Sequence, residues 1–322
     1  MDTAFTRHAH VEVPLICGPM YPCSNPELVA AVSAAGGLGV VQPLSLTYVH
    51  GYEYRAGLRH IRSLTDRPIG FNALIEASNK AYLDRMRQWI DIALEEGIRF
   101  FITSLGNPAW VCDRVHAAGG FVYHDVTEAR WAQKGADAGV DGLIAVNSQA
   151  GGHAGSRTGE ALLEELRPFG LPMVVAGGIG RPGEFARYIR MGYAAAQLGT
   201  RFIASWECTA SDAYKQAILD ATEDDIVLTE RLTGVPVSVL RNAYVEKLGT
   251  KAGVFARWML RGRKRKHWMR TLYTLSSLRR LKHSLSSPDT STDYWQAGRS
   301  VGGIDSLSPA GEIVRSFGAA LR

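Results

Sequence analysis

The chain has 322 residues, of which 46% are hydrophobic and 21% are charged, and its formal net charge is +5. This composition is too apolar for a disordered chain and too evenly charged for a fibre. The four cysteines have no zinc-ligand spacing and the N-terminus has no signal-peptide architecture, so we expect a soluble cytoplasmic protein that holds no metal.

Short apolar segments alternate with helical patterns from residue 14 to residue 198. The apolar segments have the length and composition of buried strands, and the segments between them have helical periodicity. The expected strands cover residues 14–17, 38–41, 69–72, 98–102, 120–123, 142–146, 172–176 and 195–198. The expected helices cover residues 24–35, 52–63, 80–96, 108–118, 127–139, 160–166 and 182–191. Ser24 is expected to cap the first of these helices, with Glu27 reaching back to it.

Eight strands separated by helices predict an α/β fold, a (β/α)8 TIM barrel, with an open doubly wound sheet as the competing architecture. Residues 205–290 have mostly helical patterns, and a last helix is expected to start at Ser308-Pro309. We therefore expect residues 1–204 and 291–322 to form the barrel. Residues 205–290 would be a helical insertion after the eighth strand.

The positive charge is concentrated in this insertion. Residues 251–283 contain 11 Lys and Arg and no acidic residue, which leaves 25 basic and 31 acidic residues in the rest of the chain. Hydrophobic residues recur every three or four positions from Trp268 to Leu285, so residues 251–285 are expected to include a basic amphipathic helix. Packing on the barrel or on a second subunit is the simplest interpretation. A substrate or partner surface and an anionic membrane surface are the alternatives, and nucleic acid is not expected.

Functional residues of a TIM barrel lie in the loops that follow the strands. The loops after the seventh and eighth strands are glycine-rich, with residues 177–180 in one and Gly199-Thr200 in the other. Backbone N–H groups in such loops bind phosphate, and two of them side by side form the usual phosphate site of a barrel. Tight turns without a ligand are the alternative. Residues 178–183 also match the GxGxxG pattern, but no acidic residue follows the next strand, so a dinucleotide fold is less favoured.

One histidine stands among small residues in the loop after the sixth strand, Gly151-Gly152-His153-Ala154-Gly155. Small neighbours leave room for a flat ligand and a substrate, and histidine titrates near neutrality, so His153 is the candidate acid or base. A local hydrogen bond is the alternative. For His124, after the fifth strand, a structural hydrogen bond and a cofactor contact are equally favoured.

Several motifs occur in an order that resembles the nitronate monooxygenase family, formerly called 2-nitropropane dioxygenases. They are Gly18-Pro19-Met20, residues 35–39, Gly70-Phe71-Asn72, residues 150–155, residues 176–179 and residues 197–202. The resemblance covers residues 14–245 and implies an FMN-containing barrel in which His153 is the catalytic histidine. The flavin phosphate would lie at Gly177, Gly178, Gly199 and Thr200, and the ring near Met20, Asn72 and Gly151. The remaining implied cofactor contacts are Gly18, Pro19, His124, Gly152, Ala176 and Gln197. Some relatives have a lysine after the fifth-strand histidine, where this chain has Asp125.

Three functions for a small-molecule enzyme or binder follow from this resemblance. The first is FMN-dependent oxidation of nitronates or nitroalkanes by O₂, with His153 as the base. The second is an NAD(P)H-dependent flavin reductase that acts on quinones or enoyl thioesters. The third is a non-catalytic flavin-binding barrel whose basic segment is an interaction module. A homo-oligomer is compatible with each of them.

Overall fold

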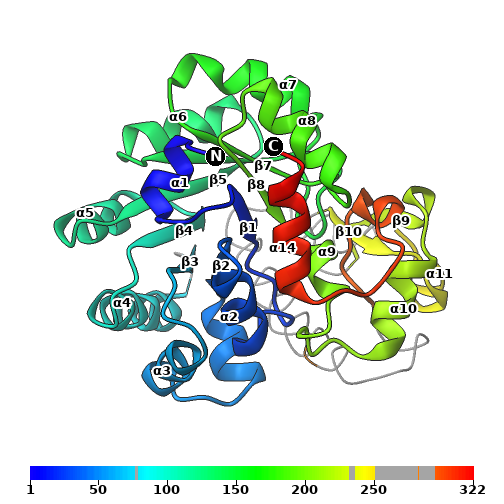
Figure 1. The fold of residues 1–322 in the computed structure, drawn as a ribbon, viewed down its shortest axis with the longest axis horizontal. Coiled ribbons are helices and arrows are strands. Elements are labelled where there is room, and N and C mark those ends of the chain that lie inside the picture. Colours follow the sequence, from blue (N-terminus) through cyan, green and yellow to red (C-terminus); the bar gives the residue numbers. More distant parts are fainter. Residues whose placement is uncertain (77–78, 232–235, 251–281, 283–293) are drawn as a thin grey trace.

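The structure is a computed structural model, and it describes residues 1–76, 79–231, 236–250, 282 and 294–322. These residues contain a closed barrel in which the strands pair in sequence order and β1 also pairs in parallel with β8 (Figure 1). The barrel strands are β1 (Leu15–Cys17), β2 (Leu38–Val41), β3 (Ile69–Ile75), β4 (Phe100–Leu105), β5 (Phe121–Val126), β6 (Gly142–Val146), β7 (Met173–Ala176) and β8 (Ala195–Leu198). The predicted TIM barrel is confirmed, and the β1–β8 pairing excludes the open sheet.

Three strands extend three residues beyond their predicted ends: β3, β4 and β5 end at residues 75, 105 and 126. Polar residues such as Asn72 and His124 suggested loops at these positions. The backbone pairing nevertheless continues through them, with Asn72 opposite Ile102 and Thr103 opposite His124. The carboxyl end of the barrel is therefore built partly from polar residues that belong to strands.

Helices surround the barrel, as their amphipathic patterns require. They are α2 (Pro26–Ala34), α3 (Tyr54–Leu64), α4 (Lys80–Glu95), α5 (Ala109–Ala117), α6 (Ala129–Asp137), α7 (Gly159–Leu166), α8 (Pro182–Met191) and α14 (Ala310–Ala319). The last of these packs against α2 and α8, where Phe317 contacts Phe185 at a ring-centroid distance of 5.6 Å. The capping prediction at Ser24 is wrong, because Asn25 is the N-cap residue and the Ser24 hydroxyl accepts a hydrogen bond from the Met20 N–H instead.

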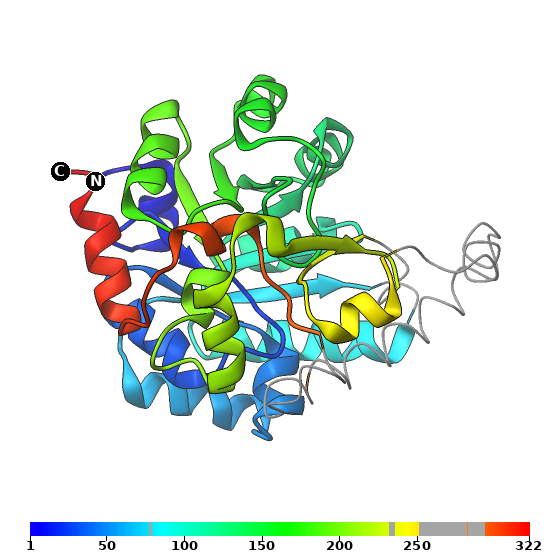
Figure 2. The ribbon, with the colours of Figure 1, turned by 90° about the vertical axis from the view of Figure 1, so that its right-hand side faces the viewer.

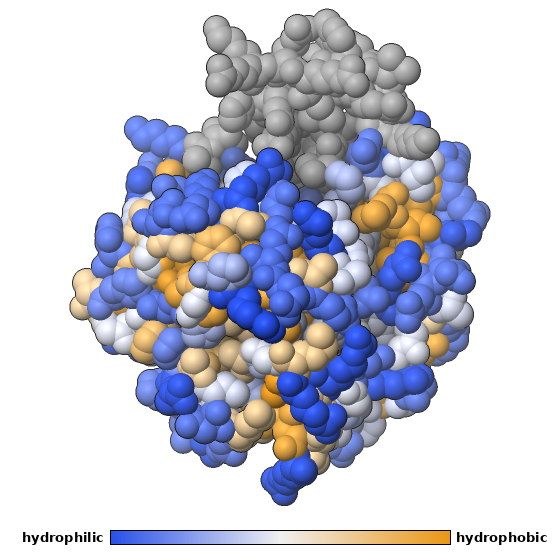
Figure 3. All heavy atoms as spheres, turned by 90° about the horizontal axis from the view of Figure 1, so that it is seen from above, coloured by the Kyte–Doolittle hydropathy of each residue, from blue (hydrophilic) through white to orange (hydrophobic). Residues whose placement is uncertain are grey.

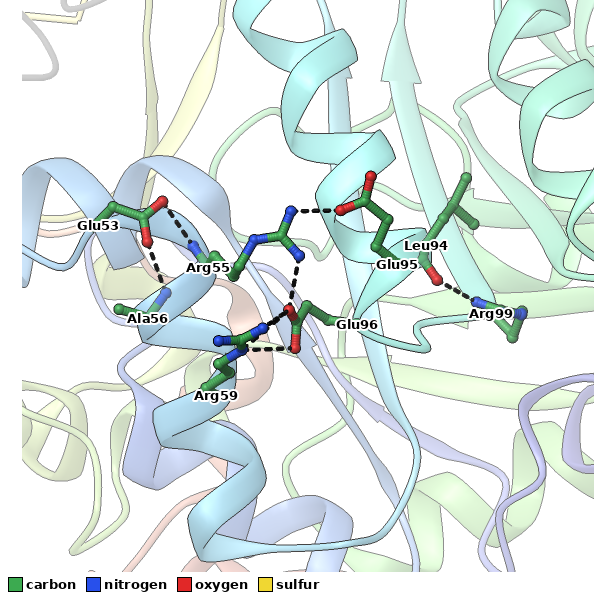
Figure 4. A network of polar contacts seen from close by, with 8 residues as sticks. All are labelled: Glu53, Arg55, Ala56, Arg59, Leu94, Glu95, Glu96 and Arg99. Carbon is green, nitrogen blue, oxygen red and sulfur yellow. Dashed lines mark hydrogen bonds and ion pairs between the residues drawn. The ribbon is translucent and has the colours of Figure 1, made fainter.

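A network of ion pairs joins α3 to the end of α4 (Figure 4). Arg55 contacts Glu95 and Glu96, and Arg59 lies 3.0 Å from the Glu96 carboxylate. Glu53, the N-cap residue of α3, accepts hydrogen bonds from the first N–H groups of the helix. The guanidinium groups of Arg59 and Arg55 lower the pKa of Glu96. Exposed pairs of this kind contribute modestly to stability, and they fix the spacing of the two helices.

The N-terminal end of the barrel is closed by α1 (Ala4–Ala9), a helix that the sequence did not indicate. Its Phe5 is fully buried and packs edge-on against Phe100 and Tyr123 inside the barrel, at centroid distances of 5.4 and 6.1 Å. Figure 2 shows α1 and both chain termini on one side of the molecule and β9, β10 and α11 on the opposite side. The end of the barrel beneath these last elements is the one available to a ligand.

The described part of the region after β8 contains strands as well as the predicted helices. It contains the one-turn helix α9 (Thr200–Ile203), α10 (Asp212–Asp220), α11 (Ala243–Leu248) and an antiparallel pair, β9 (Ile226–Thr229) and β10 (Val237–Leu240). Val237 and Val239 of this pair are fully buried in a small core with Tyr294. Such short strands depend on tertiary contacts and are therefore easily missed from sequence. The amphipathic helix expected within residues 251–285 lies outside the described residues, apart from Lys282.

The face drawn in Figure 3 is largely hydrophilic, with hydrophobic residues in separate patches. Scattered apolar residues are normal on a protein surface. In the part of the chain that the structure describes, no helix is long and apolar enough to cross a membrane.

Candidate active site

The loops after β1 and β8 meet at the carboxyl end of the barrel. The Gly18 N–H donates a hydrogen bond of 2.9 Å to the Leu198 carbonyl. A Cβ atom on Gly18 would lie 2.9 Å from Cγ of Gln197, and one on Gly199 would lie 3.5 Å from Sδ of Met20. The structure thus brings together the predicted residues of these two loops, with Pro19 between Gly18 and Met20.

The glycines after β7 have backbone conformations that other residues rarely adopt. The φ angle is 112° at Gly177 and 74° at Gly178. A Cβ on Gly177 would lie 2.4 Å from Oδ1 of Asn147, and one on Gly178 would lie 1.9 Å from Oε1 of Gln149. The fully buried Asn147 joins this loop to the loop after β6, because it donates to the Gly177 carbonyl and accepts from the Gln149 N–H. Close approach of two loops therefore requires glycine here.

Backbone N–H groups at the start of α8 already have an acceptor. The N–H groups of Gly180 and Arg181 donate to Oε2 of Glu184 at 2.7 and 3.0 Å. A phosphate at this corner of the barrel would therefore use N–H groups earlier in the loop, at residues 177–178, and those at Gly199 and Thr200. The following helix, α9, is too short to add much dipole.

The loop that carries His153 is anchored on both sides of the imidazole. Gly152 and Ser238 of β10 form an antiparallel bridge, with N–O distances of 3.2 and 2.7 Å. On the other side, the Gly155 N–H donates to the Asn147 carbonyl at 3.1 Å. His153 itself is exposed between these two anchors. The insertion after β8 therefore fixes the backbone next to the candidate acid or base.

The segment from Tyr294 to η4 (Arg299–Gly303) crosses the loops after β6, β7 and β8, and sequence reasoning missed its place in the site. The Gly298 N–H donates to Oγ1 of Thr200 at 3.0 Å, and the Arg299 N–H donates to the Gln149 carbonyl at 2.9 Å. A Cβ on Gly151 would lie 2.9 Å from the Gly298 nitrogen. The glycines at 298, 302 and 303 were the available signal, because clustered glycines permit such close packing.

His124 lies on the outer side of β5, away from the barrel interior. Its Nδ1 is 2.8 Å from Oγ1 of Thr103, and a Cβ on Gly135 of α6 would lie 3.3 Å from its Cδ2. Burial, followed by the charge of Lys134, lowers the pKa of His124 to about 4, so the imidazole is neutral. The structure does not bring His124 to the other predicted site residues, and its contacts support the structural hydrogen bond.

Asp125, the next residue on β5, faces the barrel interior because side chains alternate along a strand. Tyr123, two residues before it, belongs to the interior cluster. Asp125 is partly buried, and its Oδ1 atom is shielded from solvent without a hydrogen-bond partner among the described residues. Burial raises the pKa of this carboxyl group to about 7.

Oε1 of Gln197, on the inner side of β8, is a second shielded oxygen that lacks a partner in the described part of the chain. An unpaired buried polar atom costs about 1–3 kcal/mol, so a ligand with N–H or O–H donors fits the end of the barrel beside Asp125 and Gln197. The flavin ring carries an N–H group, its ribityl chain carries hydroxyl groups, and its phosphate suits the glycine loops. The residues present therefore fit a flavin phosphate. Among the described residues there is no cluster of His, Cys, Asp and Glu that could hold a metal ion.

Residues 2–319 match the sequence model of the nitronate monooxygenase family. The (3aS,4S,5R,7aS)-5-hydroxy-7a-methyl-1-oxo-octahydro-1H-indene-4-carboxyl-CoA dehydrogenase from Mycobacterium tuberculosis is 28% identical over 98% of this chain and 95% of its own. FabK from Thermotoga maritima superimposes with a TM-score of 0.81 and 27% identity, covering 100% of this chain and 96% of its own. The nitroalkane oxidase from Streptomyces ansochromogenes gives a TM-score of 0.78 and 25% identity, covering 99% of this chain and 98% of its own.

Proposed function

Because the chain belongs to the nitronate monooxygenase family, we propose that it oxidises nitroalkanes and their nitronates with FMN and O₂, and that His153 is the catalytic base. The family and the similar nitroalkane oxidase establish an FMN-dependent oxidoreductase of the nitronate monooxygenase type. The observation that supports the finer proposal is the exposed imidazole of His153, held between two anchored backbone positions next to the glycine loops.

FMN, when bound, supplies the acceptor for the substrate's electrons. The backbone N–H groups of Gly177, Gly178 and Gly199 would hold its phosphate, and Thr200 would stand beside them. Met20 and Asn72 would lie beside its ring, since Met20 reaches Gly199 and Asn72, which alternates with the outward Phe71 and Ala73, is buried on the inner side of β3. These residues would bind and orient the flavin, and none of them has to exchange a proton with the substrate.

His153 moves the proton in this proposal. A carbon atom next to a nitro group carries an acidic C–H, and a neutral imidazole takes that proton as the C–H bond breaks. The electron pair of the bond remains in the substrate, which becomes the nitronate. The imidazolium then returns the proton to solvent, because the side chain is exposed. Gly152 and Ala154 on either side leave space for the substrate.

Replacement of His153 by Asn tests this role. His153→Asn is expected to lose at least about a hundredfold in turnover of a neutral nitroalkane, within the range of general-base contributions. The variant is expected to keep its flavin, measured by visible absorbance, and to retain turnover of a preformed nitronate, which has already lost the proton. His60→Asn, on α3, is the matched control. Undiminished turnover of the neutral nitroalkane by His153→Asn would refute the assigned role.

A second candidate function is the dehydrogenation of an acyl-CoA thioester. It is supported by the likeness to the Mycobacterium tuberculosis CoA-ester dehydrogenase, which extends over almost the whole of both chains. A carbon next to a thioester also has an acidic C–H, so the same imidazole would serve as base. Turnover of a panel of acyl-CoA esters under the conditions used for nitroalkanes separates the two: activity with the esters alone favours the dehydrogenase.

The reductase alternative predicts a different electron source. Anaerobic mixing with NADH and NADPH would bleach the flavin rapidly in an NAD(P)H-dependent reductase and leave it oxidised in a nitronate monooxygenase. A yellow protein that is inert towards nitronates, acyl-CoA esters and nicotinamides would support the non-catalytic alternative.

A further inference from the structure

Asp125 is the inward-facing residue nearest the carboxyl end of β5. It pairs with Ile144 of β6, which belongs to the barrel interior, and the next inward residue below it is the buried Tyr123. A Cβ on Gly155 would lie 3.4 Å from Cβ of Thr127, two residues after Asp125. The loop that carries His153 therefore lies over the end of the strand that carries Asp125.

The inward positions around Asp125 are uncharged in the described part of the chain. Alternation along the strands places Leu74 of β3, Ser104 of β4 and Val146 of β6 at the inward positions closest to this end, with Asn72 one inward position below Leu74. Gln197 of β8 also faces inward, and its Oε1 has no hydrogen-bond partner among the described residues. Among the described residues, no cation occupies these inward positions to compensate the carboxylate, so Asp125 faces whatever ligand occupies the barrel end.

We propose that Asp125 is a flavin-facing residue that holds a proton near neutral pH and, by losing it, makes the bound flavin harder to reduce. The inference rests on the proposed flavin function and names a further residue of the same site. It is carried by the inward register of Asp125, by its Oδ1 atom, which has no partner among the described residues, and by the uncharged inward side chains that these residues place around it. Burial, which is the cause of its raised pKa of about 7, places the loss of the proton in the neutral range.

The direction of the effect follows from charge. A reduced flavin has gained electrons, so a carboxylate beside it is unfavourable and a neutral carboxylic acid, which can donate a hydrogen bond, is favourable. Below pH 7 the protonated Asp125 leaves the reduction unhindered. Above pH 7 the ionised group disfavours it.

The effect of Asp125 on the pH dependence of the flavin potential can be separated from that of other titratable groups near β5. His124 and Lys134 lie on the outer side of the barrel wall, where Lys134 helps to keep His124 neutral. His153, on the overlying loop, is a titratable group on the same side as Asp125. A His153→Asn background removes its contribution from the measurement.

The test is the reduction potential of the bound flavin as a function of pH in the holoprotein. Asp125→Asn preserves shape and removes ionisation, and Asp137→Asn on the exposed side of α6 is the matched control. At pH 8.5 we expect Asp125→Asn to favour the reduced flavin at least tenfold over the parent protein, a shift of about 30 mV for a two-electron couple. At pH 5.5 the two potentials should agree, and Asp137→Asn should follow the parent throughout.

Two results would overturn the inference. Identical potentials at both pH values would mean that Asp125 does not face the flavin, and an equal shift at both would mean that it holds no proton near neutrality. Asp125→Ser also lacks the carboxyl group and, measured in parallel, should show the same change in potential as Asp125→Asn if the change comes from loss of ionisation. Absence of flavin absorbance from the parent protein is a separate result, because it contradicts the proposed function itself.

Discussion

Gly177 and Gly183 lie six residues apart and differ in the space that each leaves for a side chain. Gly177 has a φ of 112° and no room for a Cβ, whereas a Cβ on Gly183 would meet nothing within 4 Å. We expect Gly177→Ala to lower the free energy of unfolding by about 1–3 kcal/mol, the cost of a disfavoured backbone conformation, and to lose most of its bound flavin. Flavin absorbance per protein and thermal unfolding measure both effects.

Gly183→Ala, at the start of the helix that follows this loop, is the control. Gly183 lies inside α8, where alanine is favoured over glycine by about 1 kcal/mol, so this variant should keep its flavin and unfold at the same or a higher temperature. If Gly177→Ala retained flavin as Gly183→Ala does, the loop after β7 would not be the phosphate site.

Single positions were predictable from sequence where the residue type itself was the signal. The glycines at 177 and 178 and the isolated His153 stood out by composition, and the structure places them at one end of the barrel. Which of His124 and Asp125 faces the barrel interior was not predictable in the same way, because the predicted strand ended at residue 123, whereas β5 continues to residue 126. Alternation along three more residues turns His124 outward and Asp125 inward.

The pair β9 and β10 reaches from the insertion to the His153 loop. Ser238 of β10 exchanges two hydrogen bonds with Gly152, while Leu228 lies opposite Ser238 on β9 and is exposed. We expect Ser238→Pro, which removes the N–H donor at this bridge, to lower turnover by about tenfold to a hundredfold through displacement of His153. Flavin content should change little, since the loops after β7 and β8 keep their contacts.

Leu228→Pro is the matched variant on the opposite strand. It introduces the same proline ring at the residue that pairs with Ser238, but on β9, the strand that does not contact Gly152 through this bridge. Steady-state kinetics of both variants measure the effect, and equal losses in the two would show that damage to the strand pair, rather than loss of the bridge, lowers the activity.

At the level of elements, the strands and helices between residues 14 and 198 were predictable because each has its own periodicity. The pair β9 and β10 was not, since it lies outside the repeat of strand and helix and contacts partners distant in sequence, such as Gly152 and Tyr294. The same reason explains α1. Its six residues are too few to indicate a helix alone, and its stability comes from Phe5 inside the barrel.

The barrel as a whole has one closed end and one functional end. Phe5 is fully buried at the closed end against Phe100 and Tyr123. We expect Phe5→Ala to lower the free energy of unfolding by about 3–5 kcal/mol, as large-to-small changes of buried aromatic residues do, without altering the flavin potential. Arg7→Ala, at an exposed residue of the same helix, should change stability by less than about 0.5 kcal/mol. Denaturant unfolding measures both, and a small effect of Phe5→Ala would contradict the role of α1 as a plug.

The number of strand–helix repeats was sufficient to predict the closed barrel, because eight such units are what close it. The passage of residues 294–303 over three loops was not predictable, since it joins positions about a hundred or more residues apart, such as Gly298 and Thr200. Local patterns were therefore sufficient to predict the barrel, whereas the position of residues 294–303 over the site depends on long-range contacts.

The visible absorption spectrum of the purified protein under anaerobic conditions, before and after addition of excess neutral nitroalkane, tests the central claim most directly. The account predicts a flavin spectrum that is bleached by the nitroalkane in the parent protein and remains oxidised in His153→Asn. A protein without flavin absorbance, or a flavin that stays oxidised with nitroalkane and nitronate alike, would contradict it.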